Sequence, residues 1–85
     1  MVPSFKPAIR IERKGRGGKS VTLISKLPAH ETFLSELCSH LKRTLGSGGT
    51  FYIANEEGVI EIHGERKEAV LELVLEYQKR DSQHR

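Results

Sequence analysis

The segment KGRGGKS at residues 14–20 is the first candidate for chemistry, because it combines three glycines with basic residues and a serine. Glycine-rich loops bind nucleotide phosphates when they follow the Walker A pattern, G-x-x-x-x-G-K-[ST], and open a helix. Gly18, Lys19 and Ser20 match the last three positions of that pattern. The first glycine of the pattern would fall at Arg13, so the match is broken.

The residues on both sides of this loop predict strands rather than a helix. Before it, AIRIERK alternates apolar and charged residues, and after it VTLIS is rich in β-branched residues. We therefore expect a β-hairpin with strands at about 8–14 and 20–25, joined by a basic loop at 15–19. Such a loop offers cations to phosphates without forming a nucleotide pocket.

The charge of the chain is concentrated in this first hairpin. The 85 residues carry a net charge of +3. Residues 1–26 contain seven basic residues and one acid, and residues 27–85 contain seven basic residues and ten acids. The first segment is thus +6 and the remainder −3, which indicates a polyanionic partner for the hairpin end. A solvated charged hairpin is the alternative.

Composition argues against several other classes of protein. The chain has a single cysteine, Cys38, and its four histidines show no metal-ligand spacing, so we expect no metal site. We also expect no cofactor and no catalytic residues, because no acid, base and nucleophile converge in the sequence. No apolar run approaches the roughly 20 residues of a membrane span, and no signal peptide is evident, which indicates a cytoplasmic protein without membrane contact.

The rest of the chain predicts an α+β domain. A helix at about 31–45 carries an apolar stripe that includes Cys38, which we interpret as a small buried hydrophobic residue. Gly46 is a candidate C-terminal cap for this helix. Strands at about 50–54 and 59–63 form a second hairpin around NEEG, and a second helix follows at about 65–79. The predicted core stripe of that helix consists of Val70, Leu73, Val74 and Tyr77, widened by Leu71.

The expected order of elements is therefore β-β-α-β-β-α. Two amphipathic helices can cover one face of a four-stranded, mostly antiparallel sheet and so form a two-layer sandwich. We expect a flexible arm at 1–7, one domain at 8–79 and a polar tail at 80–85. Phe51 and Tyr52 point to opposite faces of their strand, and the sequence leaves open which of them faces solvent.

Three segments together resemble a known family. They are RGGKSVTLIS, FLSELCSHLKRTLGSGGT and GVIEIHGERKEAVLELV, and their order and spacing cover about residues 8–78. The chain resembles the eukaryotic translation initiation factor 1 family, the suppressor-of-initiator-codon domain, and especially its short bacterial and archaeal, YciH-like members. The resemblance implies a non-enzymatic protein that binds the small ribosomal subunit and its ribosomal RNA and influences start-site or initiator tRNA selection. We also expect a monomer, because no unusually apolar exposed stripe is evident in the sequence.

Other initiation factors and, indirectly, initiator tRNA are further partners that the resemblance allows. It places RNA contacts in the basic hairpin and at the end of the first helix. The candidate RNA-binding residues are Arg13, Lys14, Arg16, Gly17, Gly18, Lys19, Lys42 and Arg43. Lys42 and Arg43 have an equally good structural interpretation, because cations in the last turn of a helix complement its dipole.

Two other classes of function remain as alternatives. The first is a protein-interaction or general RNA-binding module with a regulatory, stress-related role in translation, which would use the open sheet face or the acidic row Glu68, Glu72 and Glu76. The second is a small nucleotide hydrolase at the glycine-rich loop, which tight binding of Mg-ATP would reveal.

Overall fold

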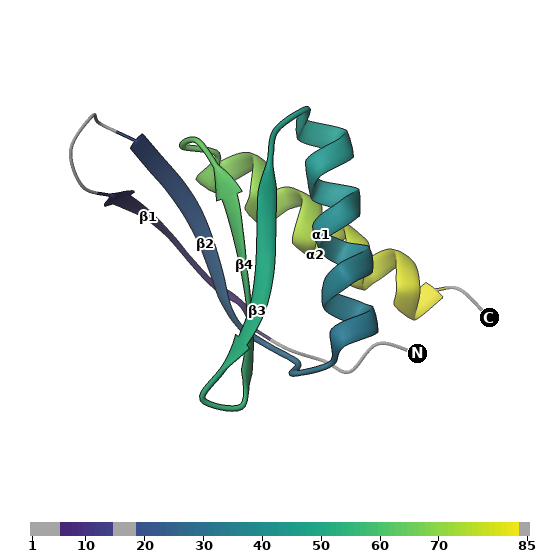
Figure 1. The fold of residues 1–85 in the computed structure, drawn as a ribbon. Coiled ribbons are helices and arrows are strands. Elements are labelled where there is room, and N and C mark those ends of the chain that lie inside the picture. The colour runs from purple at the N-terminus through teal and green to yellow at the C-terminus, as the bar shows by residue number, and fades with distance from the viewer. Residues whose placement is uncertain (1–5, 15–18, 84–85) are drawn as a thin grey trace.

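The structure, a computed structural model, describes residues 6–14 and 19–83. These residues form four strands and two helices in the predicted order (Figure 1). The elements are β1 (Ala8–Lys14), β2 (Lys19–Leu27), α1 (Glu31–Leu45), β3 (Gly49–Ala54), β4 (Glu57–His63) and α2 (Lys67–Gln83). The predicted α+β class, with two helices and one four-stranded sheet, is confirmed.

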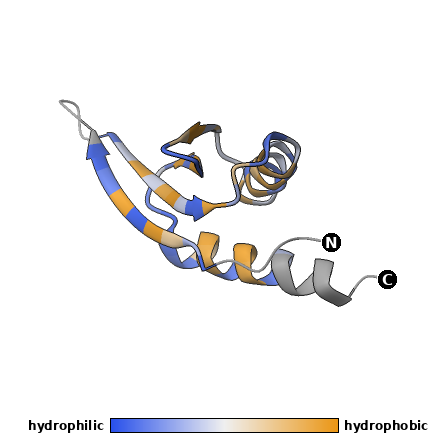
Figure 2. Cartoon of the chain, turned by 90° about the horizontal axis from the view of Figure 1, so that it is seen from below, coloured by the Kyte–Doolittle hydropathy of each residue, from blue (hydrophilic) through white to orange (hydrophobic). Residues whose placement is uncertain are grey.

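The strands form one antiparallel sheet in the order β1-β2-β4-β3. Both helices lie on the same side of this sheet (Figure 1). Helix α1 packs against β3 and β4, and α2 runs beneath the β1–β2 hairpin (Figure 2). The other side of the sheet carries no further layer among the described residues.

The core lies between the sheet and the two helices. Strand residues alternate between the two faces, as the hydrophobic and hydrophilic residues of β1 show in Figure 2. Ile24, Ile60 and Ile62 face the helices and are fully buried. Their packing partners are residues of the α1 stripe and of α2, namely Phe33, Leu34, Leu37, Cys38, Leu41, Val70 and Val74. The predicted burial of Cys38 is confirmed.

The register of β3 on β4 decides which aromatic residue is exposed. Phe51 pairs with Ile60 and packs against the core, whereas Tyr52 pairs with Val59 on the open face. Tyr52 is 41% exposed. The structure thus answers the question that the sequence left open.

Helix α1 has the predicted bounds and the predicted C-terminal cap. Gly46 adopts a left-handed conformation with φ 63°, and its N–H donates to the carbonyl of Lys42. At the other end, the imidazole Nδ1 of His30 accepts a hydrogen bond from the N–H of Phe33 at 3.3 Å. A histidine therefore takes the capping role that serine, threonine or aspartate usually fills.

Three residues other than glycine have left-handed backbone in the described part of the chain, two in a turn and one in a strand. Asn55 and Glu56, with φ of 52° and 63°, form the two-residue turn between β3 and β4. Positive φ at both positions defines a type I′ turn, which suits the twist of a hairpin. Lys26, with φ of 61°, lies where the register of β2 on β4 shifts, and its N–H donates to Glu57 at 3.2 Å. It forms a β-bulge.

The second helix differs from the prediction of 65–79, because it begins at Lys67 and extends to Gln83. Residues 64–66 are held by hydrogen bonds to β2 and cannot join the helix. No glycine or proline interrupts 67–83, so nothing in the backbone stops the helix at 79. Leu71, expected to widen the core stripe, is 40% exposed.

Candidate nucleic-acid interface

Basic residues from three parts of the chain meet at one end of the molecule. The end of β1, the start of β2, the end of α1 and the connection from β4 to α2 all lie at this end (Figure 1). We call it the basic end. It is formed by Arg13, Lys14, Lys19, Lys42, Arg43, Arg66 and Lys67.

The hairpin supplies the first group of these cations. Lys14 ends β1 and pairs in register with Lys19, which begins β2 and is exposed. Arg13 is also exposed, and its Nη2 atom lies 3.3 Å from the Oε2 atom of Glu65. Arg16, Gly17 and Gly18, three further candidate RNA-binding residues, lie outside the described residues.

The last turn of α1 supplies the second group. Arg43 is exposed and Lys42 is half-buried. The carbonyl of Lys42 accepts hydrogen bonds from the N–H groups of Gly46 and Ser47, at 3.2 Å for Ser47. Both lysine and arginine thus lie at the negative end of the helix dipole, where their charge stabilises α1 and is also available to an anionic partner.

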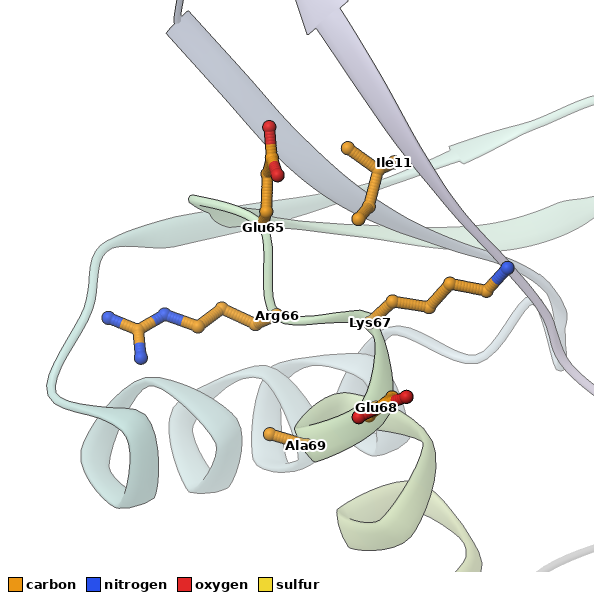
Figure 3. A pocket seen from close by; sticks show the side chains of 6 residues that line it. All are labelled: Ile11, Glu65, Arg66, Lys67, Glu68 and Ala69. Carbon is orange, nitrogen blue, oxygen red and sulfur yellow. The ribbon is translucent and has the colours of Figure 1, made fainter.

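The connection from β4 to α2 supplies a third group that sequence reasoning missed. Arg66 precedes α2 and Lys67 is its first residue, and both are exposed. Their side chains point in opposite directions, with Lys67 extending toward β1 (Figure 3). They line an open hollow of about 510 Å³ together with Ile11, Glu65, Glu68 and Ala69. The two basic residues are visible in the sequence segment GERK, but no pattern among neighbouring residues predicts that this segment lies beside the first hairpin.

A buried threonine holds this connection against the hairpin. Thr22 is fully buried, and its hydroxyl donates to the carbonyl of Gly64 at 2.7 Å. The same oxygen accepts a hydrogen bond from the N–H of Arg66 at 2.8 Å. The N–H of Gly64 donates to the carbonyl of Ser20 at 2.9 Å. The basic residues of β2 and of the connection are therefore fixed relative to one another.

Glu65 is an acidic residue that contacts one of the hairpin cations, Arg13. Its Oε2 atom accepts a hydrogen bond from the Ser20 hydroxyl at 3.1 Å and pairs with Arg13. Both charged side chains are substantially exposed, so their ion pair contributes at most about 1 kcal/mol. A phosphate can therefore compete with Glu65 for the Arg13 guanidinium at low energetic cost.

Cys38 lies in the core and not at the basic end. Burial raises the pKa of its thiol above its ordinary value, and the charge of Lys42 offsets part of that rise. A raised pKa keeps the thiol protonated and unreactive near neutral pH. In the described part of the chain, we find no group of three His, Cys, Asp or Glu side chains placed to hold a metal ion. Neither described helix is both long enough and apolar enough to cross a membrane.

Comparison with known proteins identifies relatives along most of the chain. The family model of translation initiation factor SUI1 matches residues 6–79. An uncharacterized protein YciH from Salmonella typhimurium is 37% identical over 68 residues, which cover 78% of this chain and 59% of that protein. A protein translation factor SUI1 homolog from Sulfolobus acidocaldarius is 36% identical over 67 residues, covering 79% of this chain and 63% of the relative.

A third relative, the uncharacterized protein sll0546 from Synechocystis, is 36% identical over 76 residues, covering 87% of this chain and 65% of its own length. The chain thus spans about three fifths of the length of the curated relatives that it matches. No solved structure matches it significantly. Because the SUI1 family model covers most of the residues and the shared segments include both hairpins and both helices, the chain belongs to the SUI1 translation initiation factor family.

Proposed function

We propose that this protein binds the small ribosomal subunit as a monomer in the cytoplasm, contacts its ribosomal RNA through the basic end, and influences start-site or initiator tRNA selection. Membership of the SUI1 family supports a role in translation initiation. The observation that carries the RNA contact is the convergence of Arg13, Lys14 and Lys19 with Arg66 and Lys67 at one end of the fold.

The chemistry of the basic end suits structured RNA. The phosphates of RNA attract lysine and arginine side chains. Neutralisation of these phosphates releases counterions, so that binding weakens as the salt concentration rises. A-form RNA is recognised mainly by its shape and phosphate positions, which requires a protruding basic element rather than a deep pocket. The β1–β2 hairpin extends beyond the helices and has this form (Figure 1).

Co-sedimentation with purified small subunits at low and raised salt tests this proposal. We expect salt-sensitive binding by the wild-type protein and much weaker binding by the triple variant Lys14→Ala, Arg16→Ala, Lys19→Ala. Removal of one phosphate-binding cation should lower the slope of log affinity against log salt by about one. Binding that survives the triple substitution would contradict the RNA contact.

A comparison of two double variants, each of which removes two cations, separates the effect of the basic end on binding from the effect of net charge. Lys42→Ala with Arg43→Ala removes two cations at the basic end, whereas Lys6→Ala with Lys26→Ala removes two cations at the opposite end of β1 and β2. We expect only the first pair to weaken binding. Equal weakening by both pairs would mean that net charge, rather than this surface, drives association.

An initiation assay with AUG and near-cognate reporters then tests start-site selection.

A second candidate function is that of a regulatory module that binds a protein partner. Glu68, Glu72 and Glu76 are all exposed on α2, and their spacing of four places them along one face of the helix. A basic partner, such as another initiation factor, would suit this face. Retention of a defined initiation factor after ribonuclease treatment, and its release when all three glutamates are changed to glutamine, would favour this function.

A further inference from the structure

The outer side of β1 is an open edge of the sheet. In the part of the chain that the structure describes, β1 pairs with β2 alone, and no strand lies on its other side. An edge strand presents a row of backbone N–H and C=O groups that can pair with another extended chain. β1 therefore offers one row of backbone groups to a further strand.

The hydrogen bonds of β2 identify the residues of β1 that form this row. The carbonyl of Ser20 accepts a hydrogen bond from the Gly64 N–H, so the backbone groups of Ser20 point toward β4. Successive residues of an antiparallel strand direct these groups to opposite sides, so those of Val21 point toward β1, where Val21 pairs with Glu12. Glu12 therefore bonds β2, and its neighbour Ile11 presents its N–H and carbonyl outward.

Exposed apolar side chains lie on the helix side of this edge. Ile9 and Ile11 share one face of β1, and Ile9 packs against the core. Ile11 is nevertheless 37% exposed, and Leu71 and Leu75 of α2 are 40% and 50% exposed. Three of the five exposed large hydrophobic residues that the structure describes are thus on β1 and α2.

These two elements lie side by side. α2 runs beneath the β1–β2 hairpin (Figure 2), and the Lys67 side chain extends toward β1 (Figure 3). Leu71 and Leu75 follow Lys67 at intervals of four residues, which places them on the same side of the helix. Ile11 lines the hollow of about 510 Å³ together with the first turn of α2. The open edge of β1 therefore adjoins an apolar surface formed by Ile11, Leu71 and Leu75, which we call the α2 shelf.

The charges beside the α2 shelf indicate what can cover it. Glu68 and Glu72 are exposed and precede Leu71 and Leu75 by three residues each, so they border the leucines on the helix surface. These carboxylates repel the phosphates of RNA and of lipid headgroups. A second copy that paired through its own β1 would bring two acidic helices together. The partner that fits is a protein segment with apolar residues and positive charge.

The arginines of β1 do not exclude such a segment, because each pairs with a carboxylate. The Nη2 atom of Arg10 lies 3.4 Å from the Oε2 atom of Glu12. The Nη2 atom of Arg13 lies 3.3 Å from the Oε2 atom of Glu65. These two side chains therefore add little net charge to the edge.

We infer that the outer edge of β1 binds an extended, basic segment of a partner protein as an additional strand, with alternate apolar side chains resting on the α2 shelf. The added strand pairs with the backbone of Ile9 and Ile11. Strand addition is a common mode of peptide recognition, in which backbone hydrogen bonds supply affinity and contacts of alternate side chains supply specificity. The inference goes beyond the proposed RNA contact and does not depend on it.

A synthetic peptide tests this inference. Valine alternates with threonine in the peptide, so that the valines share one face of an extended chain, and a lysine stands at each end. Binding to the protein is followed by NMR titration and by amide hydrogen exchange. The N–H groups of Ile9 and Ile11 should exchange at least about tenfold more slowly in the complex than in the free protein. Those of Arg10 and Glu12 bond β2 and should be protected in both states.

Variants assign the binding to the α2 shelf. Leu71→Ser with Leu75→Ser should weaken peptide binding by about tenfold, because the valines lose their apolar contacts. Ile53→Ser is the matched control, since Ile53 is 49% exposed on the other edge strand, and it should leave the affinity unchanged. Urea unfolding verifies that the double variant folds. If it does not, the single variant Leu75→Ser, at the more exposed position, decides.

Three results would overturn the inference. The first is no binding even at millimolar peptide concentration. The second is binding that leaves exchange at Ile9 and Ile11 unchanged, which would indicate a different site or a helical partner. The third is protection of these two N–H groups that grows with protein concentration alone, which would indicate a second copy as the occupant. Salt-sensitive binding to small subunits should persist in Leu71→Ser with Leu75→Ser, so failure of either proposal leaves the other standing.

Discussion

The side-chain oxygen of Thr22 lies 2.8 Å from the backbone nitrogen of Arg66 and accepts its hydrogen bond, across 44 residues of sequence. The same hydroxyl donates to the carbonyl of Gly64. Both backbone groups lie between the end of β4 and the first turn of α2, where neither a strand nor a helix supplies them with a partner. This buried side chain therefore holds the start of α2 against the hairpin strand, together with the hydrogen bond from the Gly64 N–H to the Ser20 carbonyl.

Thr22→Val should lower the free energy of unfolding by about 2 kcal/mol, because valine keeps the shape of threonine but leaves the Arg66 N–H without an acceptor. Urea unfolding measures this decrease. Amide hydrogen exchange gives a more specific result, since the Arg66 N–H should exchange faster in Thr22→Val and remain protected in Thr22→Ser. Equal protection in both variants would show that the hydroxyl does not hold the connection.

Glu56→Gly should raise the free energy of unfolding by about 1 kcal/mol. Glu56 has φ of 63° in the two-residue turn, and left-handed backbone costs a non-glycine residue about 1 kcal/mol or more. Thermal and urea unfolding both report the change. Glu57→Gly serves as the comparison and should be destabilising, because Glu57 lies in β4 and its carboxylate accepts the Lys26 N–H.

Ser47→Ala should stabilise the protein by about 1 kcal/mol. The Oγ atom of Ser47 is buried and has no hydrogen-bond partner among the described residues. A buried polar atom without a partner loses its hydration and gains nothing in return. Ser25→Ala is the control, because the Ser25 hydroxyl is exposed and bonds the Ala8 carbonyl, so that its removal should change stability by less than about 0.5 kcal/mol. A destabilised Ser47→Ala variant would argue that a water molecule satisfies this hydroxyl.

Cys38 should make the stability of the protein fall at alkaline pH. Burial raises the pKa of its thiol in the folded state, so the folded chain keeps a proton that the unfolded chain releases. The contribution of this thiol to the free energy of unfolding is complete below the pKa of the unfolded thiol, about 8.5. That contribution is lost as the pH rises through the pKa of the thiol in the folded state. Urea unfolding from about pH 7 to about pH 10.5 should show a steeper decline for wild type than for Cys38→Ala. Parallel curves would contradict a raised thiol pKa.

Local sequence patterns were sufficient to predict most of the elements. The three- and four-residue spacing of leucines places α1 at 31–45, and Gly46 caps it, because helix periodicity and left-handed backbone are properties of neighbouring residues. The alternation of apolar and charged residues along AIRIERK likewise predicts β1 at 8–14. The basic hairpin, half of the candidate interface, could therefore be predicted from residues close in sequence.

Only the tertiary structure decided which distant residues join that hairpin. Arg66 and Lys67 reach the basic end because β4 pairs with β2 and Thr22 binds the following connection, and no local pattern encodes such pairing. The exposure of Tyr52 depends in the same way on its register with Val59. Periodicity shows that a strand has two faces, but the strand order and the packing of the helices determine which face is buried.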